Sequence, residues 1–496
     1  MADAAEAGKV VGRSPRTGQP RNVISPTEQD ELVRAISAGV SGPVGSHARS
    51  SAGWWTPIRV LLAVTTVVFA LGMIQKAPCV QDDWLGPKPF THLCYSDIGY
   101  LYADRGFAEN KVPYLDDSGR YPVMEYPVLT GFFAYGAGLV TNWLIDAPDV
   151  SLLPADQVPS DPAVQSDSSV YFAVTVVALF LCALLAVWAM AGIHARRPWD
   201  AMFLAAAPAL ALAGTINWDL FAVAFVMTAL LAWSRSHPLV CGLLIGLGAA
   251  AKLYPLFLLG PLLVLCLRTS RTRAWFVCVV GAAAAWLAVN APIYLQAPDQ
   301  WASFWKFNAS RGGDYGSFWY VLSLAGHPVS SHVINLVSLG AFGLACVAVA
   351  GLGLFASRRP RLPQLIFLVV ASFLLVNKVY SPQYVLWLLP LAALARPRWR
   401  DVLIWQSFEV LYFVGIWMHL GGMLQPAGDG EPDRVYWLIV FLRLAATAWF
   451  MGMVVRDILR PWHDPVRQDG LDDDPAGGVF DETHDAPWVD SILART

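Results

Sequence analysis

The stretch between Cys79 and Pro127 is rich in carboxylates. The stretch holds eight acidic residues: Asp82, Asp83, Asp97, Asp104, Glu109, Asp116, Asp117 and Glu125. A carboxylate held close to an attacking hydroxyl can take its proton as a general base, and Asp97, in the run CYSDIGYLY, is the candidate for this role. Asp82 and Asp83 could instead ligate a metal ion. Adjacent carboxylates in a loop are more often solvated, however, and we expect no metal site and no cofactor.

The composition of the chain indicates a membrane protein. About 56% of the 496 residues are apolar and only 14% are charged, whereas about a quarter of the residues of a soluble domain are charged. A helix needs about 20 apolar residues to cross the hydrocarbon core of a bilayer, and such runs recur from Ile58 onward. The sequence therefore predicts an all-α polytopic membrane protein, surrounded by membrane lipids and without a nucleic-acid partner.

The positions of the arginines divide the chain into inner and outer segments. Basic turns recur after every second apolar run, at Arg196, Arg235, Arg268, Arg358, Arg396 and Arg456. Because cytoplasmic turns are enriched in Lys and Arg, we expect about 12 transmembrane helices in the plasma membrane, with both termini cytoplasmic. Tyr126–Ile145 does not fit this alternation, so we expect it to lie in the interface or to re-enter from the outer face.

The predicted organisation has three parts. Residues 1–55 are rich in Ala, Gly, Ser, Pro and Arg, and we expect a disordered cytoplasmic arm. Residues 56–456 form the membrane domain, with large outer loops at 76–169 and 296–331. Residues 457–496 form an acidic cytoplasmic tail, which we expect to be solvated.

Two of the seven cysteines, Cys79 and Cys94, lie in or beside the acidic stretch. In an oxidising compartment they could close a loop of about 16 residues, which stabilises the folded state by roughly 3 kcal/mol in the entropic model. The alternative is a pair of free thiols. The other five cysteines lie in apolar runs, where cysteine behaves as a small hydrophobic residue. We expect the disulfide.

Three predicted hairpins have arms too short to cross the whole bilayer. Their arms of about 14 to 19 residues mostly reach roughly 21 to 24 Å, so their turns should lie below the outer surface. The candidate binding residues at these turns are Asn217, Asp219, Lys252, Tyr254, Lys378, Tyr380 and Gln383. Because ionised groups at this depth need protein or a wet cavity around them, we expect an outward-facing cavity. The alternative is that Lys252 and Lys378 reach the lipid headgroups as ordinary lysines at helix ends.

A cavity lined by cations and carboxylates suits a lipid-linked phosphate. Lys and Arg pair with phosphoryl oxygens while the lipid tail stays in the bilayer, and the second outer loop adds Arg311, Asp314 and His327 as candidate contacts. Transfer of a sugar from such a carrier needs a base and positive charge beside the leaving phosphate. A transporter or flippase of a lipid or sugar is the alternative, although the chain shows no convincing repeat of one half in the other. A non-catalytic scaffold is a third interpretation.

Seven motifs, taken together and in order, resemble the bacterial family 87 glycosyltransferases, which are integral membrane enzymes of the GT-C type. The motifs are SDIGYLYADRGF, KVPYLD, EYPVLTGFF, INWDLFAV, AAKLYPLFLLGPLL, FNASRGGDYGSFWYVL and NKVYSPQYVLWLLPL. The similarity covers roughly Val60 to Arg456. Characterised relatives include actinobacterial α-mannosyltransferases that depend on polyprenyl-phosphate-mannose.

The resemblance implies a GT-C-type bundle that moves a sugar, with mannose favoured, from a polyprenyl-phosphate donor to a glycolipid or lipoglycan acceptor on the outer face. Asp97 matches the acidic residue that acts as base in the first outer loop of such enzymes. Glu125 and Tyr126 open the EYP motif, whose helix tends to lie along the interface, and are candidate substrate contacts. His327 loosely matches a histidine in a late outer loop. The other motif positions that match are Lys252, Tyr254, Lys378, Tyr380 and Gln383.

Overall fold

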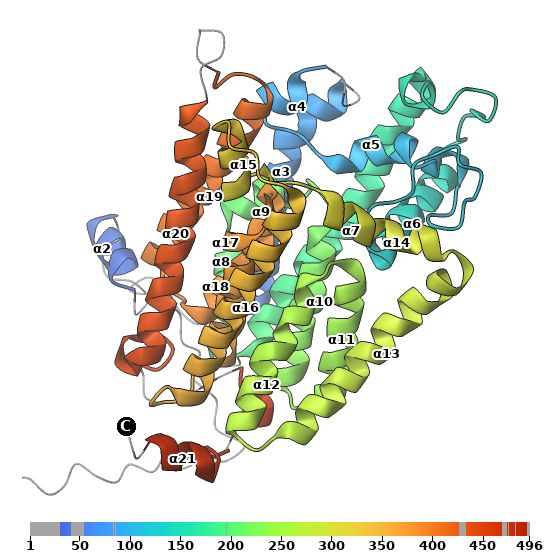
Figure 1. The fold of residues 1–496 in the computed structure, drawn as a ribbon. Helices are drawn as coiled ribbons and strands as arrows, with labels where there is room; N and C mark the ends of the chain where they lie inside the picture. Colours follow the sequence, from blue (N-terminus) through green and yellow to red (C-terminus); the bar gives the residue numbers. More distant parts are fainter. Residues whose placement is uncertain are drawn as a thin grey trace, which may run out of the picture.

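The chain folds into a bundle of helices in a computed structural model (Figure 1). The structure describes residues 30–40, 54–82, 84, 86–194, 196–425, 433–468, 474, 476–481 and 483–493. Within these residues, strand structure is confined to two short segments, β1 (Asp314–Tyr315) and β2 (Val379–Tyr380). The prediction of an all-α polytopic membrane fold is confirmed.

The bundle contains both long and short apolar helices. In the described part of the chain, six helices are long and apolar enough to cross a membrane: α3 (Pro57–Gln81), α7 (Pro162–Ile193), α13 (Thr272–Gln296), α16 (Ser331–Phe355), α19 (Trp399–Leu420) and α20 (Arg434–Leu459). The shorter ones are α6 (Val128–Leu144), α8 (Met202–Ala205), α9 (Pro208–Ala213), α10 (Asp219–Ser234), α11 (Pro238–Ala251), α12 (Leu259–Arg268), α17 (Leu362–Val376) and α18 (Val385–Ala395). Helices α10, α11 and α17 have 16, 14 and 15 residues, which corresponds to about 21 to 24 Å. These lengths agree with the short hairpin arms expected from the sequence.

Proline residues begin several of the short helices. Proline has no backbone N–H and a fixed φ, so it is favoured in the first turn of a helix. It occupies this position in α9, in the 3₁₀ turn η4 (Tyr254–Leu258) that precedes α12, and in η5 (Pro382–Tyr384) before α18. The chain between α9 and α10, between α11 and η4, and between α17 and η5 is therefore irregular, and we call these three turns the hairpin tips.

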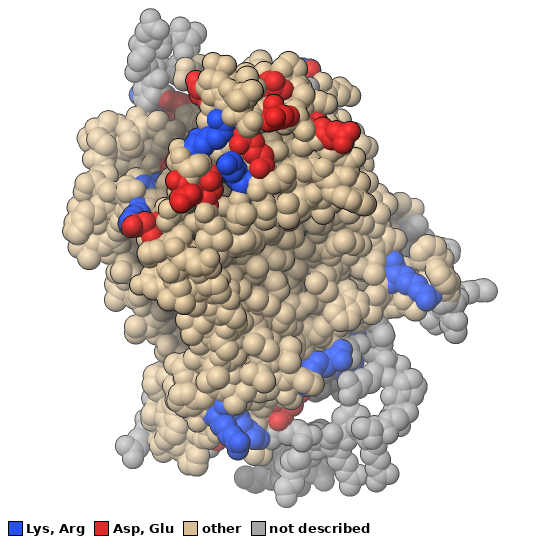
Figure 2. All heavy atoms as spheres, turned by 90° about the vertical axis from the view of Figure 1, so that its right-hand side faces the viewer, with Lys and Arg blue, Asp and Glu red and all other residues tan. Residues whose placement is uncertain are grey.

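The connecting loops gather at one end of the bundle (Figure 1). This loop end contains α4 (Lys88–Thr91), α5 (Asp97–Asp104), η1 (Phe107–Glu109), η2 (Val158–Ser160), α14 (Pro298–Ser310) and α15 (Phe318–Leu324). The opposite end, which we call the tail end, contains η6 (Pro461–His463), η7 (Gly478–Phe480), α21 (Pro487–Leu493) and, at the start of α8, η3 (Pro198–Ala201). Figure 2 shows acidic side chains gathered at the loop end of one face, with an uncharged region below them. A charge-free band of this kind is what contact with lipid requires.

The C-terminal tail packs against the tail end of the bundle. The expectation of a solvated tail is wrong for its described residues, because Asp464 is fully buried and its Oδ2 lies 2.7 Å from Nε of Arg361. Asp485 forms a second ion pair at 2.6 Å with the buried Arg268, at the end of α12. Acidic residues of the tail thus neutralise arginines that end or begin membrane helices.

A short helix, α2 (Glu31–Val40), lies within the N-terminal arm, where we expected no regular structure. Oδ1 of Asp30 accepts a hydrogen bond from the amide of Leu32 at 3.0 Å and so caps the helix. Oδ2 of Asp30 accepts another from the amide of Trp399 at 2.9 Å, which ties the helix to the start of α19. Residues 1–29 and 41–53, where the rest of this prediction falls, lie outside the described residues.

Candidate active site

Asp97 begins helix α5 and is anchored to the first hairpin tip. Ser96 caps the helix, since its Oγ accepts from the amide of Ile98 at 3.2 Å, and the same hydroxyl donates to the carbonyl of Thr215 at 2.7 Å. The amide of Asp97 donates to the carbonyl of Ile216 at 2.8 Å. These bonds join two segments about 120 residues apart in sequence. The carboxylate of Asp97 is therefore held against the tip between α9 and α10.

Three side chains donate hydrogen bonds to the carboxylate of Asp97. The hydroxyl of Tyr95 donates to Oδ1 at 2.8 Å, and Nδ2 of Asn217 donates to Oδ2 at 2.9 Å. The hydroxyl of Tyr126 donates to Oδ2 at 3.3 Å and accepts from Nδ2 of Asn217 at 2.7 Å. Asn217 and Tyr126 were candidates from the sequence, whereas Tyr95 was not. Its place two residues before the proposed base is the signal that could have identified it.

Opposing effects act on the pKa of Asp97. Burial raises this pKa, and the hydrogen bonds from Tyr95 and Asn217 and the charge of Lys252 lower it, with a net shift upward from the usual value of an aspartate. Burial and the neighbouring Asp97 charge raise the pKa of Tyr95, so its hydroxyl keeps its proton and acts as a donor. Asp97 is thus a stronger base than an ordinary surface aspartate, which suits a group that must accept a proton.

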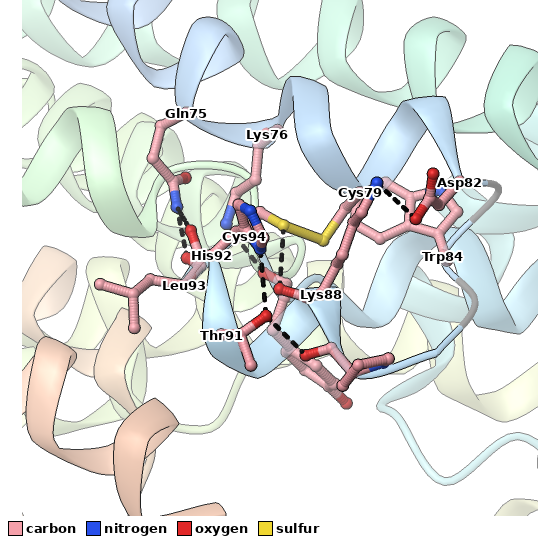
Figure 3. The surroundings of a disulfide bond; sticks show 12 residues. Gln75, Lys76, Cys79, Asp82, Trp84, Lys88, Thr91, His92, Leu93 and Cys94 are labelled. Carbon is pink, nitrogen blue, oxygen red and sulfur yellow. Dashed lines mark hydrogen bonds and ion pairs between the residues drawn. A yellow bond between two sulfur atoms is a disulfide. The ribbon is translucent and has the colours of Figure 1, made fainter. Parts of the chain in front are cut away.

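A disulfide between Cys79 and Cys94 fixes the segment that leads to Asp97 (Figure 3). It joins the last turn of α3 to the chain three residues before Asp97. On the same turn of α3, Nζ of the buried Lys76 donates to the carbonyl of Tyr95 at 2.8 Å. The end of α3 thereby restrains both the backbone of Tyr95 and the start of α5. Sequence reasoning missed Lys76, because a single lysine near the end of an apolar run is typical of a side chain that reaches the headgroups.

A cavity of about 800 Å³ opens beside Asp97. Nine of the residues predicted from the sequence line it: Asp97, Glu125, Tyr126, Asn217, Lys252, Tyr254, Arg311, Lys378 and Gln383. They come from the first loop, from the second loop and from all three hairpin tips. The short hairpin arms were expected to place the three tips at the same depth. In the structure, residues from all three tips line the same cavity.

The cations of the cavity differ in their partners. Nζ of Lys252 lies 3.6 Å from Oδ1 of Asp219 and 5.0 Å from the ring centroid of Tyr126. Nζ of Lys378, in contrast, contacts two neutral acceptors, the side-chain oxygen of Asn335 at 2.6 Å and the carbonyl of Asn308. The charge of Lys378 is thus not cancelled by a carboxylate in direct contact with it, which leaves it available to an anionic substrate.

Stacked aromatic rings form another part of the cavity wall. The ring centroids of Tyr254 and Trp387 are 4.4 Å apart, and the two rings are inclined by only 9°. The ring centroid of Tyr384 lies 4.2 Å from that of Trp387. The stack fixes the position of the rings in this part of the wall, since Tyr254 and Trp387 are buried. Trp387 lies inside an apolar run of the sequence, so nothing in its spacing distinguished it from a residue of the core.

Two of the predicted binding residues lie behind the cavity wall. Asp219 is fully buried and accepts a hydrogen bond from Nε1 of Trp387 at 2.7 Å. Tyr380 is also fully buried, and its hydroxyl donates to Oε2 of Glu409 at 2.7 Å. Neither residue lines the cavity. Both are placed to support lining residues, because Oδ1 of Asp219 bonds to Trp387 and the hydroxyl of Tyr380 bonds to Glu409.

The charged candidates of the loops also have partners. Glu125 reaches the cavity but forms an ion pair with Arg105 at 2.7 Å. Asp314 does not line the cavity, and its Oδ2 accepts from Nε of Arg311 at 3.1 Å. His327 is exposed on the loop after α15 and does not line the cavity. The prediction of direct contacts from Asp314 and His327 therefore has no support in this geometry.

The described residues contain no cluster of three or more His, Cys, Asp or Glu side chains arranged to hold a metal ion. Asp82, considered above as a ligand, pairs with Lys88 at 2.6 Å. Asp83 lies outside the described residues.

The chain is similar to a known protein family over its middle part. The family model described as glycosyltransferase family 87 matches residues 152–377, and no curated protein matches the chain. The matched segment includes the tips that carry Asn217 and Lys252 and the loop that carries Arg311, whereas Asp97 precedes it. The resemblance to this family is confirmed for the matched residues.

Proposed function

We propose that this chain, a membrane glycosyltransferase of family 87, moves a sugar from a polyprenyl-phosphate carrier to a glycolipid or lipoglycan acceptor. Mannose is the sugar we propose, because the motifs resemble mannosyltransferases. We also propose that the cavity faces the outside of the plasma membrane and that both termini are cytoplasmic, since arginine-rich turns lie at the end opposite the cavity.

One observation carries the proposal: a carboxylate of raised basicity and three cations line a single cavity. Asp97 lines the cavity together with Lys252, Arg311, Lys378 and Glu125. A carrier phosphate needs cations, and an attacking hydroxyl needs a base. The cavity offers both and is large enough for a sugar and the two groups that exchange it.

The proposed reaction is a single displacement. The acceptor hydroxyl gives its proton to Asp97 while its oxygen attacks the anomeric carbon of the donor sugar. The bond between that carbon and the phosphate oxygen breaks, and the electron pair leaves with the phosphate. Lys378 stabilises the charge that develops on this leaving group. Attack from the face opposite the phosphate inverts the anomeric configuration.

We propose that no divalent metal takes part, because lysine and arginine side chains supply positive charge where the phosphate would lie. Rates that fall in the presence of a chelator and recover with added magnesium would contradict this part of the proposal.

The test uses purified protein, polyprenyl-phosphate-mannose and a membrane lipid extract, with mass spectrometry to detect a product heavier by one hexose. Asp97→Asn should abolish transfer, because the amide cannot accept the proton. Asp117→Asn is the matched control, since this carboxylate belongs to the same loop but is exposed to solvent. Transfer by the Asp97 variant at the wild-type rate would remove Asp97 from the reaction.

A further inference from the structure

Two ionisable residues are buried within the last pair of long helices, away from the cavity. Glu409 of α19 is 4% exposed and Arg443 of α20 is 1% exposed, and neither lines the cavity. Ionisable groups inside membrane helices are energetically costly and usually have a function. In the described structure the charged ends of these two side chains contact Tyr380 and not each other. Their burial therefore needs another explanation.

Tyr380, on the third hairpin tip, connects the two charges. Its hydroxyl donates to Oε2 of Glu409 at 2.7 Å, and the guanidinium carbon of Arg443 lies 3.6 Å from the centroid of its ring. A cation over an aromatic face is attracted by the ring, more strongly where water is excluded. Glu409 thus holds the hydroxyl of Tyr380, and Arg443 packs on the face of its ring.

The same residues hold the second outer loop to this tip. The carbonyl of Tyr380 accepts from the amide of Gly316 at 3.3 Å and from the hydroxyl of Tyr412 at 2.6 Å. Nη2 of Arg443 donates to the carbonyl of Gly316 at 3.0 Å. A Cβ at position 316 would lie 2.4 Å from the ring of Tyr412, so the close approach of this loop requires glycine. Arg443 therefore contacts both sides of the junction between loop and tip.

This junction is the parallel bridge between β1 and β2, and it places residues that line the cavity. Asp314 pairs with Val379 and Tyr315 pairs with Tyr380, and the amide of Asp314 donates to the carbonyl of Lys378 at 2.8 Å. Tyr315 adopts a φ of 42°, a left-handed conformation that a residue with a side chain keeps only when its surroundings enforce it. The bridge thus restrains the backbone of two cavity residues, Tyr315 and Lys378.

We propose that Arg443 and Glu409 are positioning residues for glycosyl transfer, which act through Tyr380 and Gly316 to hold the cavity wall that carries Arg311, Tyr315 and Lys378. They touch neither substrate nor reacting atoms. The inference rests on the proposed function insofar as that wall binds the donor phosphate. Loss of either charge should therefore weaken donor binding more than it slows the chemical step.

The kinetic test compares KM for the donor with kcat. Arg443→Met keeps an unbranched apolar stem and removes the guanidinium group, with its charge and its bond to Gly316. We expect KM to rise about tenfold and kcat to stay within about twofold, the pattern of lost ground-state binding. Arg443→Lys should give a smaller rise, because it restores a charge without the planar group. Tyr380→Phe should raise KM as well, whereas Tyr171→Phe, which removes another buried tyrosine hydroxyl outside this cluster, should not.

A second measurement reports the wall itself and needs no substrate. A nitroxide spin label is attached to the cysteine of a Gly312→Cys variant, and its mobility is measured. Gly312 lies in the loop just before β1, where an added Cβ meets no atom within 4 Å. The partly exposed free cysteines Cys182 and Cys346 are replaced by serine in this background. We expect the nitroxide to become more mobile in Arg443→Met and in Tyr380→Phe, and to be unchanged in Tyr171→Phe.

The outcomes separate the two proposals. Wild-type protein that transfers no sugar would overturn the proposed function, while the nitroxide would still show whether Arg443 holds the wall. An immobile nitroxide in both variants would overturn the positioning role. A mobile nitroxide with unchanged KM would show that the wall does not bind the donor, which overturns the inference as stated. If Arg443→Met does not fold, Tyr380→Phe decides, because it retains the aromatic ring.

Discussion

Removal of the Asn217 side chain should move the acid limb of the pH–rate profile toward higher pH. Asp97 must be ionised to take a proton, so the rate falls when the pH drops through its pKa. Nδ2 of Asn217 donates to this carboxylate at 2.9 Å and stabilises the ionised form. Asn217→Ala removes that stabilisation and raises the pKa of Asp97 above its already elevated value. The variant should therefore lose activity at acidic pH first.

The size of the shift follows from the strength of the bond. A hydrogen bond to a charged group contributes about 1.5 to 3 kcal/mol, and one pKa unit corresponds to about 1.4 kcal/mol. The limb should therefore move by about 1 to 2 pH units, reduced where a water molecule replaces the amide. Tyr126→Phe removes a longer bond, at 3.3 Å, and should shift the limb less in the same direction.

The assay is kcat/KM for the donor, measured from acidic to neutral pH, because this ratio reports the ionisation of the free enzyme. Asn290→Ala is the matched control, since this buried asparagine of α13 bonds to Trp301 and not to Asp97. A limb that stays in place in Asn217→Ala, or that moves to lower pH, would refute the assignment of Asp97 as the titrating base.

Three further predictions concern the supports of the cavity. Replacing both Cys79 and Cys94 by serine should lower the melting temperature and kcat together, because the disulfide restrains the chain before Asp97. Thermal unfolding measures the melting temperature, and initial rates measure kcat. Lys378→Ala should raise KM for the donor about tenfold and also lower kcat, because Lys378 stabilises the charge that develops on the leaving phosphate, whereas alanine in place of Lys306, an exposed lysine at the same end of the molecule, should change neither. Asp464→Ala should destabilise the fold by about 3 to 5 kcal/mol, since it leaves Arg361 buried without its partner. The measurement is thermal unfolding in detergent. Asp156→Ala is the control, because this carboxylate is exposed and its loss should not alter the unfolding temperature.

The general position of the cavity could be predicted from helix lengths. Short arms before and after Asn217, Lys252 and Lys378 place these residues below the surface, and the need to satisfy buried charges then requires a chamber. The partners within that chamber could not be predicted. Trp387 looks like a core residue, and Tyr95 like one aromatic among many. Both gain their roles only from tertiary packing.

The C-terminal tail shows a different reason for failure. Its acidic composition is typical of a solvated segment, and nothing in the local sequence distinguishes Asp464 from its neighbours. Arg361 provides the missing information, because it is buried between the ends of α17 and α18 and donates to the carbonyls of Leu394 and Ala395. The charge of a buried arginine must be compensated, and here a carboxylate of the tail compensates it. Local sequence reasoning cannot match two residues 103 positions apart.

The distribution of charge in the cavity favours one orientation of the substrates. Lys252 lies beside two carboxylates, since it contacts Asp219 and acts on the charge of Asp97. Lys378 faces only neutral oxygen atoms in its direct contacts, so the phosphate should bind on its side of the chamber. The acceptor hydroxyl must then approach from the side of Asp97. A nucleophile and a leaving group on opposite sides of the sugar are what a single inverting displacement requires, and fixed charges that favour this arrangement before reaction lower its barrier.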